Sequence, residues 1–124
     1  MTRVCFQLQV DPELIPAYRE RHRAVWPAML REIHASGRRN YSLFLRPDGL
    51  LIGYYETDSV LTGDFYLASS EVAAAWEADM GALFAGLDGR ADQVAVELEE
   101  VFNLEDQLAA LPPEVAAPPT EEED

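Results

Sequence analysis

The first part of the chain shows one strand pattern followed by two helical patterns. Hydrophobic and polar residues alternate strictly over residues 4–10, which predicts a half-buried strand with a polar but uncharged second face. Asp11 and Pro12 supply an N-cap and a first helical residue, so we expect a helix from residue 12 into the low twenties. Pro27 starts a second helical segment, and Gly37 ends it.

The middle of the chain predicts a β-hairpin. Residues 40–46 and 50–56 both carry strand patterns, and the Pro-Asp-Gly sequence at 47–49 has the chemistry of a tight turn. The pattern over residues 58–69 fits either a short helix or a loop.

The following stretch predicts one more helix and one more strand. Ser70 is suited to cap a helix that runs through Phe84. Residues 86–93, which are rich in Gly, Asp and Arg, are expected to form a loop, and residues 95–104 a fourth strand. The apolar stripe expected along the helix consists of Val72, Ala75, Trp76, Met80 and Leu83.

The elements therefore follow the βαββαβ order of a ferredoxin-like fold in the α+β class. Helices on one face of a single sheet leave the other face bare, and such domains commonly cover it by pairing sheets. We therefore expect a homodimer of a domain that spans residues 1–104. Residues 105–124 are acidic and proline-rich, and we expect this C-terminal tail to be disordered at least from Pro112.

Composition narrows the partners and the location. The formal net charge is −14, from 23 acidic and 9 basic residues, which argues against a nucleic-acid partner because phosphate binding needs a basic patch. We see no apolar run long enough to cross a membrane and no signal peptide, so we expect a cytoplasmic protein that does not bind membranes. The single cysteine, Cys5, excludes an intramolecular disulfide and is expected to be a small buried hydrophobic residue.

Tyr18, His22 and Trp26 are spaced four residues apart. On a helix this spacing puts Tyr18 and His22 on one face, while Pro27 predicts a bend at Trp26. A phenol, an imidazole and an indole at one bend can form the wall of a pocket for a small polar ligand, or they can be ordinary core. The residues alone leave both readings open.

The sequence lacks the signatures of bound cofactors and metals. It has no Gly-rich phosphate loop, no dinucleotide fingerprint and no serine nucleophile elbow, and His22 and His34 lack metal-ligand spacing. What remains is acid–base chemistry at His22, since histidine titrates near neutral pH. Tyr41 can hydrogen-bond hydroxyl groups and Trp76 can stack on a sugar ring. We expect neither a cofactor nor a metal.

Four segments, in this order and at this spacing, carry a resemblance to a known family. They are Tyr18-x-x-x-His22 with Val25-Trp26-Pro27, then Asn40-Tyr41-Ser42-Leu43-Phe44-Leu45, then Trp76-x-x-x-Met80, and finally Glu97-Leu98-x-Glu100-Val101-Phe102-x-Leu104. Through them residues 1–104 resemble the L-rhamnose mutarotases. The resemblance implies a dimeric α+β barrel of ferredoxin-like protomers and cofactor-free interconversion of the α and β anomers of L-rhamnose. It also implies that His22 is the proton donor and that Tyr18, Tyr41 and Trp76 contact the sugar.

Glu77 departs from the family pattern, which often has a second tryptophan at this position. Either the preferred sugar differs, or this position lies at the edge of the pocket. In the expected mechanism His22 protonates the ring oxygen, and the base is left open between a tyrosine, a water and a carboxylate such as Glu99. Two other functions stay open: a cofactor-free monooxygenase of the dimeric α+β barrel group, and a non-catalytic sugar-binding or assembly module.

Overall fold

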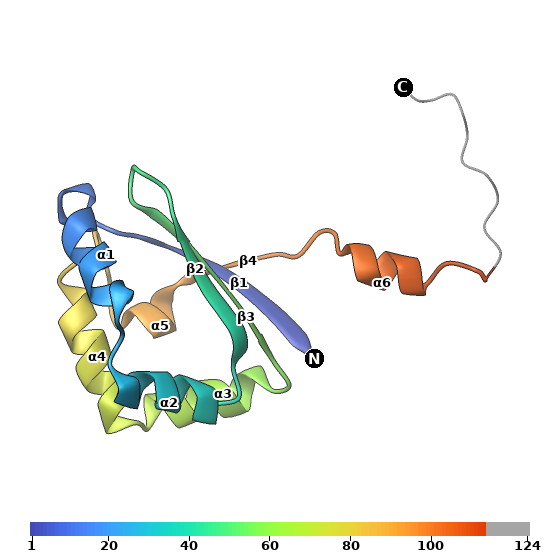
Figure 1. Cartoon of the computed structure of the whole chain (residues 1–124), viewed down its shortest axis with the longest axis horizontal. Helices are drawn as coiled ribbons and strands as arrows, with labels where there is room; N and C mark the ends of the chain where they lie inside the picture. The colour runs from blue at the N-terminus through green and yellow to red at the C-terminus, as the bar shows by residue number, and fades with distance from the viewer. Residues whose placement is uncertain (114–124) are drawn as a thin grey trace.

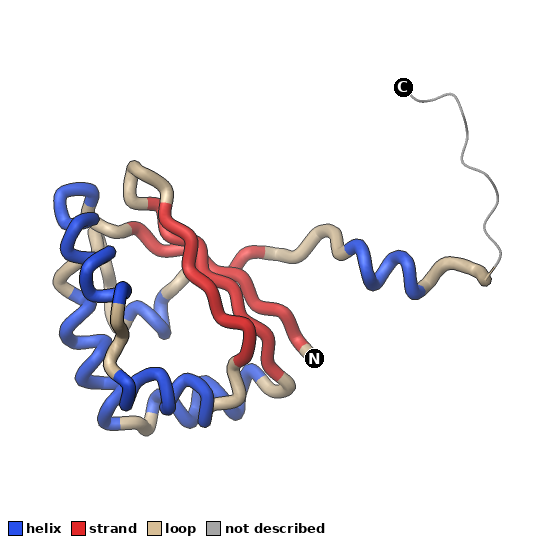
Figure 2. The backbone as a smooth tube through the Cα atoms, in the orientation of Figure 1, coloured by secondary structure: helices blue, strands red, loops and turns tan. Residues whose placement is uncertain are grey.

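The computed structural model describes residues 1–113 and places helices against one face of a four-stranded sheet (Figure 1). Figure 2 shows the strands and helices as separate layers, which confirms the predicted α+β class. Within the described residues no helix is long and apolar enough to span a membrane. The elements are β1 Thr2–Gln9, η1 Pro12–Leu14, α1 Ile15–Arg23, α2 Pro27–Ala35, β2 Arg39–Leu45, β3 Leu50–Thr57, α3 Val60–Ala68, α4 Glu71–Gly81, α5 Ala91–Val94, β4 Val96–Leu98 and α6 Leu104–Ala109.

The sheet has the strand order β2-β3-β1-β4, and its pairings are antiparallel. This is the order of a ferredoxin-like fold. The predicted hairpin is confirmed, because β2 and β3 pair across the turn at 47–49. Gly49 in that turn has φ +96, a left-handed conformation that glycine adopts without a steric penalty.

The first helical region and the bend after it form as the sequence predicts. Asp11 accepts a hydrogen bond from the backbone N–H of Glu13, and the short 3-10 helix η1 leads into α1. Trp26 takes φ −50 and ψ 129, and α2 begins at Pro27. The chain turns here because a residue that precedes proline is disfavoured in the α conformation.

Serine residues cap the next two helices. Ser59 accepts a hydrogen bond from the backbone N–H of Thr62 at the start of α3, so residues 58–69 contain a helix rather than only a loop. Ser70 does the same for Ala73 in α4, as predicted. Both side chains satisfy donors that the first turn of a helix leaves without partners.

The predicted apolar stripe of α4 is wrong at one position. Ala75 is exposed, and Ala73 is buried beside Trp76 and Met80. Residues 73, 76 and 80 lie on one face of α4, and the helix packs against α2 and α3. Residue 75 points away from that face. The core that this face completes consists of Val10, Ile15, Tyr18, Met29, Leu51, Leu67, Ala73, Trp76, Met80 and Leu83.

The fourth strand is much shorter than predicted. β4 spans Val96–Leu98 rather than residues 95–104, and it pairs with residues 5–7 of β1. If this register continued, Val101 would lie opposite Thr2, where β1 begins. Residues 102–104 would then lie beyond the start of β1, with no strand opposite them in the described part of the chain, while residues 99–101 stay unpaired although β1 continues opposite them. The predicted loop over 86–93 is wrong at its end, because α5 begins at Ala91.

Beyond β4 the chain leaves the sheet and forms α6 (Figure 1). The guanidinium of Arg3 on β1 donates hydrogen bonds to Glu100, at 2.7 Å, and to Asp106 on α6. Helix α6 begins at Leu104, the last residue of the predicted domain, and continues into the stretch predicted as a tail. The disorder predicted from Pro112 falls mainly on residues 114–124, which lie outside the described part of the chain.

The face of the sheet that points away from the helices, here called the outer face, carries exposed apolar side chains. Strand pairing sets Phe44 beside Ile52, Ile52 beside Gln7, and Gln7 beside Val96. Phe44 is 63% exposed and Val96 58% exposed. Cys5 lies in the next row and is half-buried, so the expectation of a buried cysteine is only partly met.

Candidate active site

Two adjoining cavities lie between the helices and the opposite, inner face of the sheet. Their volumes are about 540 Å³ and about 70 Å³. His22, Tyr41 and Trp76 line both cavities, and Tyr18 lines the smaller one. The structure therefore brings together all four residues that the sequence analysis selected, from α1, β2 and α4. Their catalytic and sugar-binding roles stay predictions.

Tyr18 and His22 form one wall. The two rings stack with centroids 4.1 Å apart and an interplanar angle of 22°, as expected for positions four apart on a helix. His22 Nδ1 lies 2.9 Å from the backbone oxygen of Tyr18. Because a carbonyl oxygen only accepts hydrogen bonds, Nδ1 carries the proton in the neutral ring. Within residues 1–113, Nε2 has no hydrogen-bond partner in the protein, so its lone pair is available to a ligand.

The indole of Trp76 lies against the same wall. Its ring meets His22 edge-on at 5.5 Å between centroids, and Trp26 meets it edge-on at 5.0 Å. Trp76 is 7% exposed, whereas Trp26 is 37% exposed. Trp26, at the bend after α1, therefore packs behind the indole that lines the cavities.

The opposite wall comes from the sheet. Tyr41 stacks on Tyr55 with ring centroids 5.3 Å apart, and Phe6 meets Tyr41 edge-on at 6.3 Å. The Phe6 ring occupies the space over Gly53, where a Cβ atom would lie 2.1 Å from its Cζ. Gly53 is thus required for the aromatic packing that holds Tyr41 in place.

Burial determines the protonation states of the two tyrosines. Burial raises the pKa of Tyr41 to about 12, and it also raises the pKa of Tyr18 well above its ordinary value. Both phenols therefore keep their protons at neutral pH. They are suited to hydrogen-bond sugar hydroxyls and are poor candidates for the general base.

Burial acts on His22 in the opposite direction. It lowers the pKa of the imidazole, and the hydrogen bond to Tyr18 only partly offsets this effect. His22 is therefore predominantly neutral at pH 7, with its proton on Nδ1.

A carboxyl group that the sequence analysis treated only as a departure from the family pattern also faces this space. Glu77 follows Trp76 on α4 and lines both cavities together with Asp92. Its Oε1 accepts a hydrogen bond from the backbone N–H of Asp92, at 3.3 Å. Burial, and then the negative charge of Asp92, raise the pKa of Glu77 to about 7.

The partners of Glu77 come from α5, which the sequence analysis did not predict. Arg90 donates two hydrogen bonds to the carboxylate of Asp92, at 2.8 and 2.7 Å. Arg90 is the arginine nearest to Glu77 in sequence. Because its guanidinium is paired with Asp92, it stabilises the carboxylate of Asp92 more than that of Glu77. A carboxylate directly after a core tryptophan was the only sequence signal for a buried acid at this position.

The carboxylate that the sequence analysis named as a possible base does not lie at the site. Glu99 is exposed beyond β4 and does not line either cavity. Among the described residues, no group of three or more His, Cys, Asp or Glu side chains is arranged to hold a metal ion.

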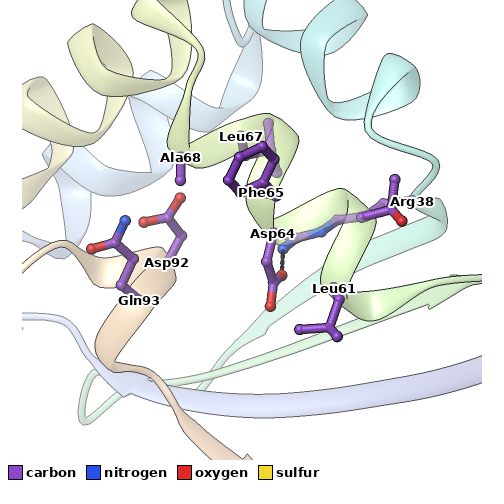
Figure 3. Close-up of a pocket in the computed structure, with 9 residues that line it drawn as sticks. Arg38, Leu61, Asp64, Phe65, Leu67, Ala68, Asp92 and Gln93 are labelled. Carbon is purple, nitrogen blue, oxygen red and sulfur yellow. Dashed lines mark hydrogen bonds and ion pairs between the residues drawn. The ribbon is translucent and has the colours of Figure 1, made fainter.

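A third cavity, of about 700 Å³, adjoins the larger one through Arg38 and Asp92 (Figure 3). Arg38 is 8% exposed, and its guanidinium lies 2.7 Å from Asp64 and 4.2 Å above the ring of Tyr55. The ion pair and the cation–π contact hold this cation between the cavities.

Comparison with known proteins points to one family. The profile of the L-rhamnose mutarotase family matches residues 3–104. An L-rhamnose mutarotase from Sinorhizobium fredii is 33% identical over 108 residues, covering 84% of this chain and 99% of that protein. One from Lachnoclostridium phytofermentans is 32% identical over 108 residues, covering 85% of this chain and all of that protein.

Solved structures share the fold. The crystal structure of an L-rhamnose mutarotase from Formosa agariphila superposes with a TM-score of 0.71 at 24% identity, covering 84% of this chain and 99% of that one. Tetracenomycin F2 cyclase from Streptomyces glaucescens, a type-II polyketide cyclase, gives a TM-score of 0.50 at 18% identity, covering 84% of this chain and 97% of that one. At these identities the likeness concerns the fold alone.

Proposed function

The chain belongs to the L-rhamnose mutarotase family, and we propose that it is an isomerase that interconverts the α and β anomers of L-rhamnose or a related aldose. The observation that carries the proposal is the single cavity wall formed by Tyr18, His22 and Trp76 opposite Tyr41. The family match does not favour the cofactor-free monooxygenase. A non-catalytic sugar-binding module would give saturable sugar binding without faster anomer exchange.

The reaction needs two proton transfers. Anomers exchange when the ring opens to the aldehyde, the C1–C2 bond rotates and the ring closes again. Opening requires one proton to leave the anomeric hydroxyl and one to reach the ring oxygen. We assign one of these transfers to His22. It acts through Nε2, because Nδ1 already donates a hydrogen bond to the backbone carbonyl of Tyr18. The donor role implied by the family resemblance requires the imidazolium form, which burial disfavours.

The remaining predicted residues bind the sugar in this proposal. Tyr18 and Tyr41 offer protonated phenols to its hydroxyl groups from opposite walls, and Trp76 offers an apolar ring surface to its C–H groups. No metal or other cofactor is required, because the reaction already proceeds unaided in water. Positioned proton transfer contributes about 10²–10⁴-fold, which is sufficient for such a reaction.

NMR exchange between the α and β anomeric protons of L-rhamnose tests the proposal. The protein should increase saturation transfer above the spontaneous level. His22→Ala should lower the catalysed rate by about 10²–10⁴-fold, because the proton-transfer group is lost. Arg19→Ala, at an exposed residue of the same helix that lines neither cavity, is the control. A catalysed rate that His22→Ala leaves unchanged would contradict the role of His22.

We also propose that the working form is a homodimer in the cytoplasm. The exposed apolar side chains of the outer face, together with Val101 and Phe102 at 84% and 61% exposure, support burial against a second copy. Sedimentation of the purified chain tests the dimer.

The net charge of −14 supports the proposal that nucleic acids and anionic membranes are not partners. The family match ends at residue 104, which supports the proposed boundary between domain and tail.

A further inference from the structure

Two groups able to transfer protons line the same cavities from two different helices. His22 comes from α1 and Glu77 from α4, and both line the larger and the smaller cavity. The mechanism so far uses only His22 and leaves the second transfer without a residue. Glu77 is a second acid–base group in the same site, available for that transfer.

The surroundings of Glu77 leave it free to act on a ligand. Its recorded hydrogen bond is the long one from the Asp92 N–H to Oε1, and within residues 1–113 Oε2 has no partner in the protein. Asp64 pairs with Arg38, and Asp92 pairs with Arg90. The two nearby guanidinium groups are thus held by other carboxylates, and Glu77 keeps one oxygen for a substrate.

The geometry points to Glu77 as the general acid of the reaction, which protonates the ring oxygen, and to His22 as the base that takes the proton of the anomeric hydroxyl. This assignment rests on the proposed function. It reverses the role that the family resemblance implies for His22. It also gives a catalytic role to the position where this chain departs from the family pattern.

The proposed step balances in protons and electrons. Nε2 of His22 takes the hydroxyl proton, and the electrons of that O–H bond form the C1=O double bond. The C1–O5 bond breaks with its electron pair moving to the ring oxygen, which receives the carboxyl proton of Glu77. The aldehyde then lies beside an imidazolium and a carboxylate. After rotation about C1–C2, the two transfers run in reverse and restore both residues.

The resting protonation states suit these roles. Burial lowers the pKa of His22, so the ring is neutral with Nε2 unprotonated, while Glu77, with a pKa of about 7, retains its proton in a large fraction of molecules at neutral pH. Two neutral groups also cost less to bury than two charges. The ion pair that forms during ring opening is stabilised by the attraction between its members, which a partly buried site strengthens.

A defined pH profile follows. The charged and titratable groups that share these cavities with Glu77 or act on its charge are Asp92 on α5, Arg90 at its N-cap, His34 on α2, Arg38 before β2, Arg39 and Tyr41 on β2, and Tyr18 and His22 on α1. Both tyrosines titrate far above neutral pH, and the arginines stay charged throughout. Activity should fall as the pH rises through about 7, where Glu77 loses its proton. It should also fall at low pH, as His22 gains one below its ordinary pKa.

Glu77→Gln tests the assignment, because it keeps the shape of the side chain and removes the transferable proton. The expected result is a kcat about 10²-fold lower, with sugar affinity retained. The fall in activity near pH 7 should disappear, and the fall at low pH should remain. Asp79→Asn, on an exposed part of the same helix, should change neither. A Glu77→Gln rate and pH profile equal to those of the unmodified protein would overturn the acid role.

A titration of the unmodified protein gives a readout that does not depend on the variant. Carbon-13 NMR of the Glu77 carboxyl should show a midpoint near pH 7, and nitrogen-15 NMR of His22 should show the proton on Nδ1 at that pH. A midpoint at the ordinary value for glutamate, or a protonated Nε2, would overturn the assignment. Absence of anomer exchange with any aldose would instead overturn the proposed function itself, and the acid role with it.

Discussion

The inner and outer faces of the sheet both carry apolar side chains, but in the described part of the chain only the inner face has helices that cover it. On the inner face, strand pairing aligns Leu8 with Leu51 and Leu51 with Leu45, and these residues pack into the core. The corresponding outer row leaves Phe44 and Val96 exposed. Both faces therefore carry apolar side chains, mixed on the outer face with Gln7 and Gln9 of β1, and the two faces differ most in coverage.

This difference shows that the chain's own helices cover one face, while the other stays open within residues 1–113, where the proposed second copy would pack. The inner face gains specific partners, including the aromatic pairs around Tyr41 and Trp76, and these pairs also shape the cavities. The outer face has no such partners within residues 1–113. A substitution on the inner face should alter stability and the site together, whereas one on the outer face should alter association alone.

The largest effect is expected from Trp76→Ala on the covered side. Removing a buried indole leaves a cavity and should lower the free energy of unfolding by about 3–5 kcal/mol. Sugar binding should weaken as well, because the indole lines both cavities. Chemical denaturation measures the first effect and calorimetric titration with L-rhamnose the second. Trp26→Ala, at the half-exposed tryptophan, is the matched control and should cost clearly less. Equal losses would mean that the two indoles are covered equally.

Gly53→Ala should have an intermediate effect. A Cβ atom at this position overlaps the Phe6 ring, so the ring must move towards Tyr41, at a cost of about 1–3 kcal/mol. Thermal unfolding measures that loss, and a rise in KM for the sugar would show that the cavity wall has moved. Gly81→Ala meets no atom within 4 Å and should be neutral or slightly stabilising, since glycine is a poor helix former. A Gly53→Ala protein as stable as this control would show that the inner packing is not tight.

The smallest effect on an isolated protomer is expected from Phe44→Ser on the outer face. An exposed substitution changes stability by less than about 0.5 kcal/mol. If the outer face is buried in a dimer, the melting temperature of the unmodified protein should rise with its concentration, and the variant should lose much of that dependence. Phe65→Ser, at an exposed phenylalanine of α3, should leave association unchanged. A melting temperature independent of concentration in every protein would contradict the dimer.

The sequence predicted the elements whose signals are local. Proline at 27, the serine cap at 70 and the turn at 47–49 each fix the backbone through their own side chains, and the structure has all three. The length of β4 was wrong because alternation along residues 95–104 does not reveal where pairing with β1 stops. Ala75 was misplaced because a small residue fits either face of a helix.

The site divides in the same way. The spacing of Tyr18 and His22 sets their stacking, so this part of the wall was predictable from the sequence. The tautomer of His22 and the burial of Glu77 were not. The first depends on a backbone carbonyl, and the second on Asp92 in α5, a helix in a stretch whose composition indicated a loop. A side-chain contact within α1 and a tertiary contact with α5 thus determined the protonation states that give the site its chemistry.

The edge-on contact between Trp26 and Trp76 also makes the protein its own optical probe. These are the two tryptophans of the chain, and their rings are 5.0 Å apart, close enough for their excited states to couple. Because Trp76 lines the cavities and Trp26 lies behind it, a sugar that enters should change both the emission and the near-ultraviolet circular dichroism. Ligand occupancy can then be followed in unlabelled protein, with sugars that have no chromophore.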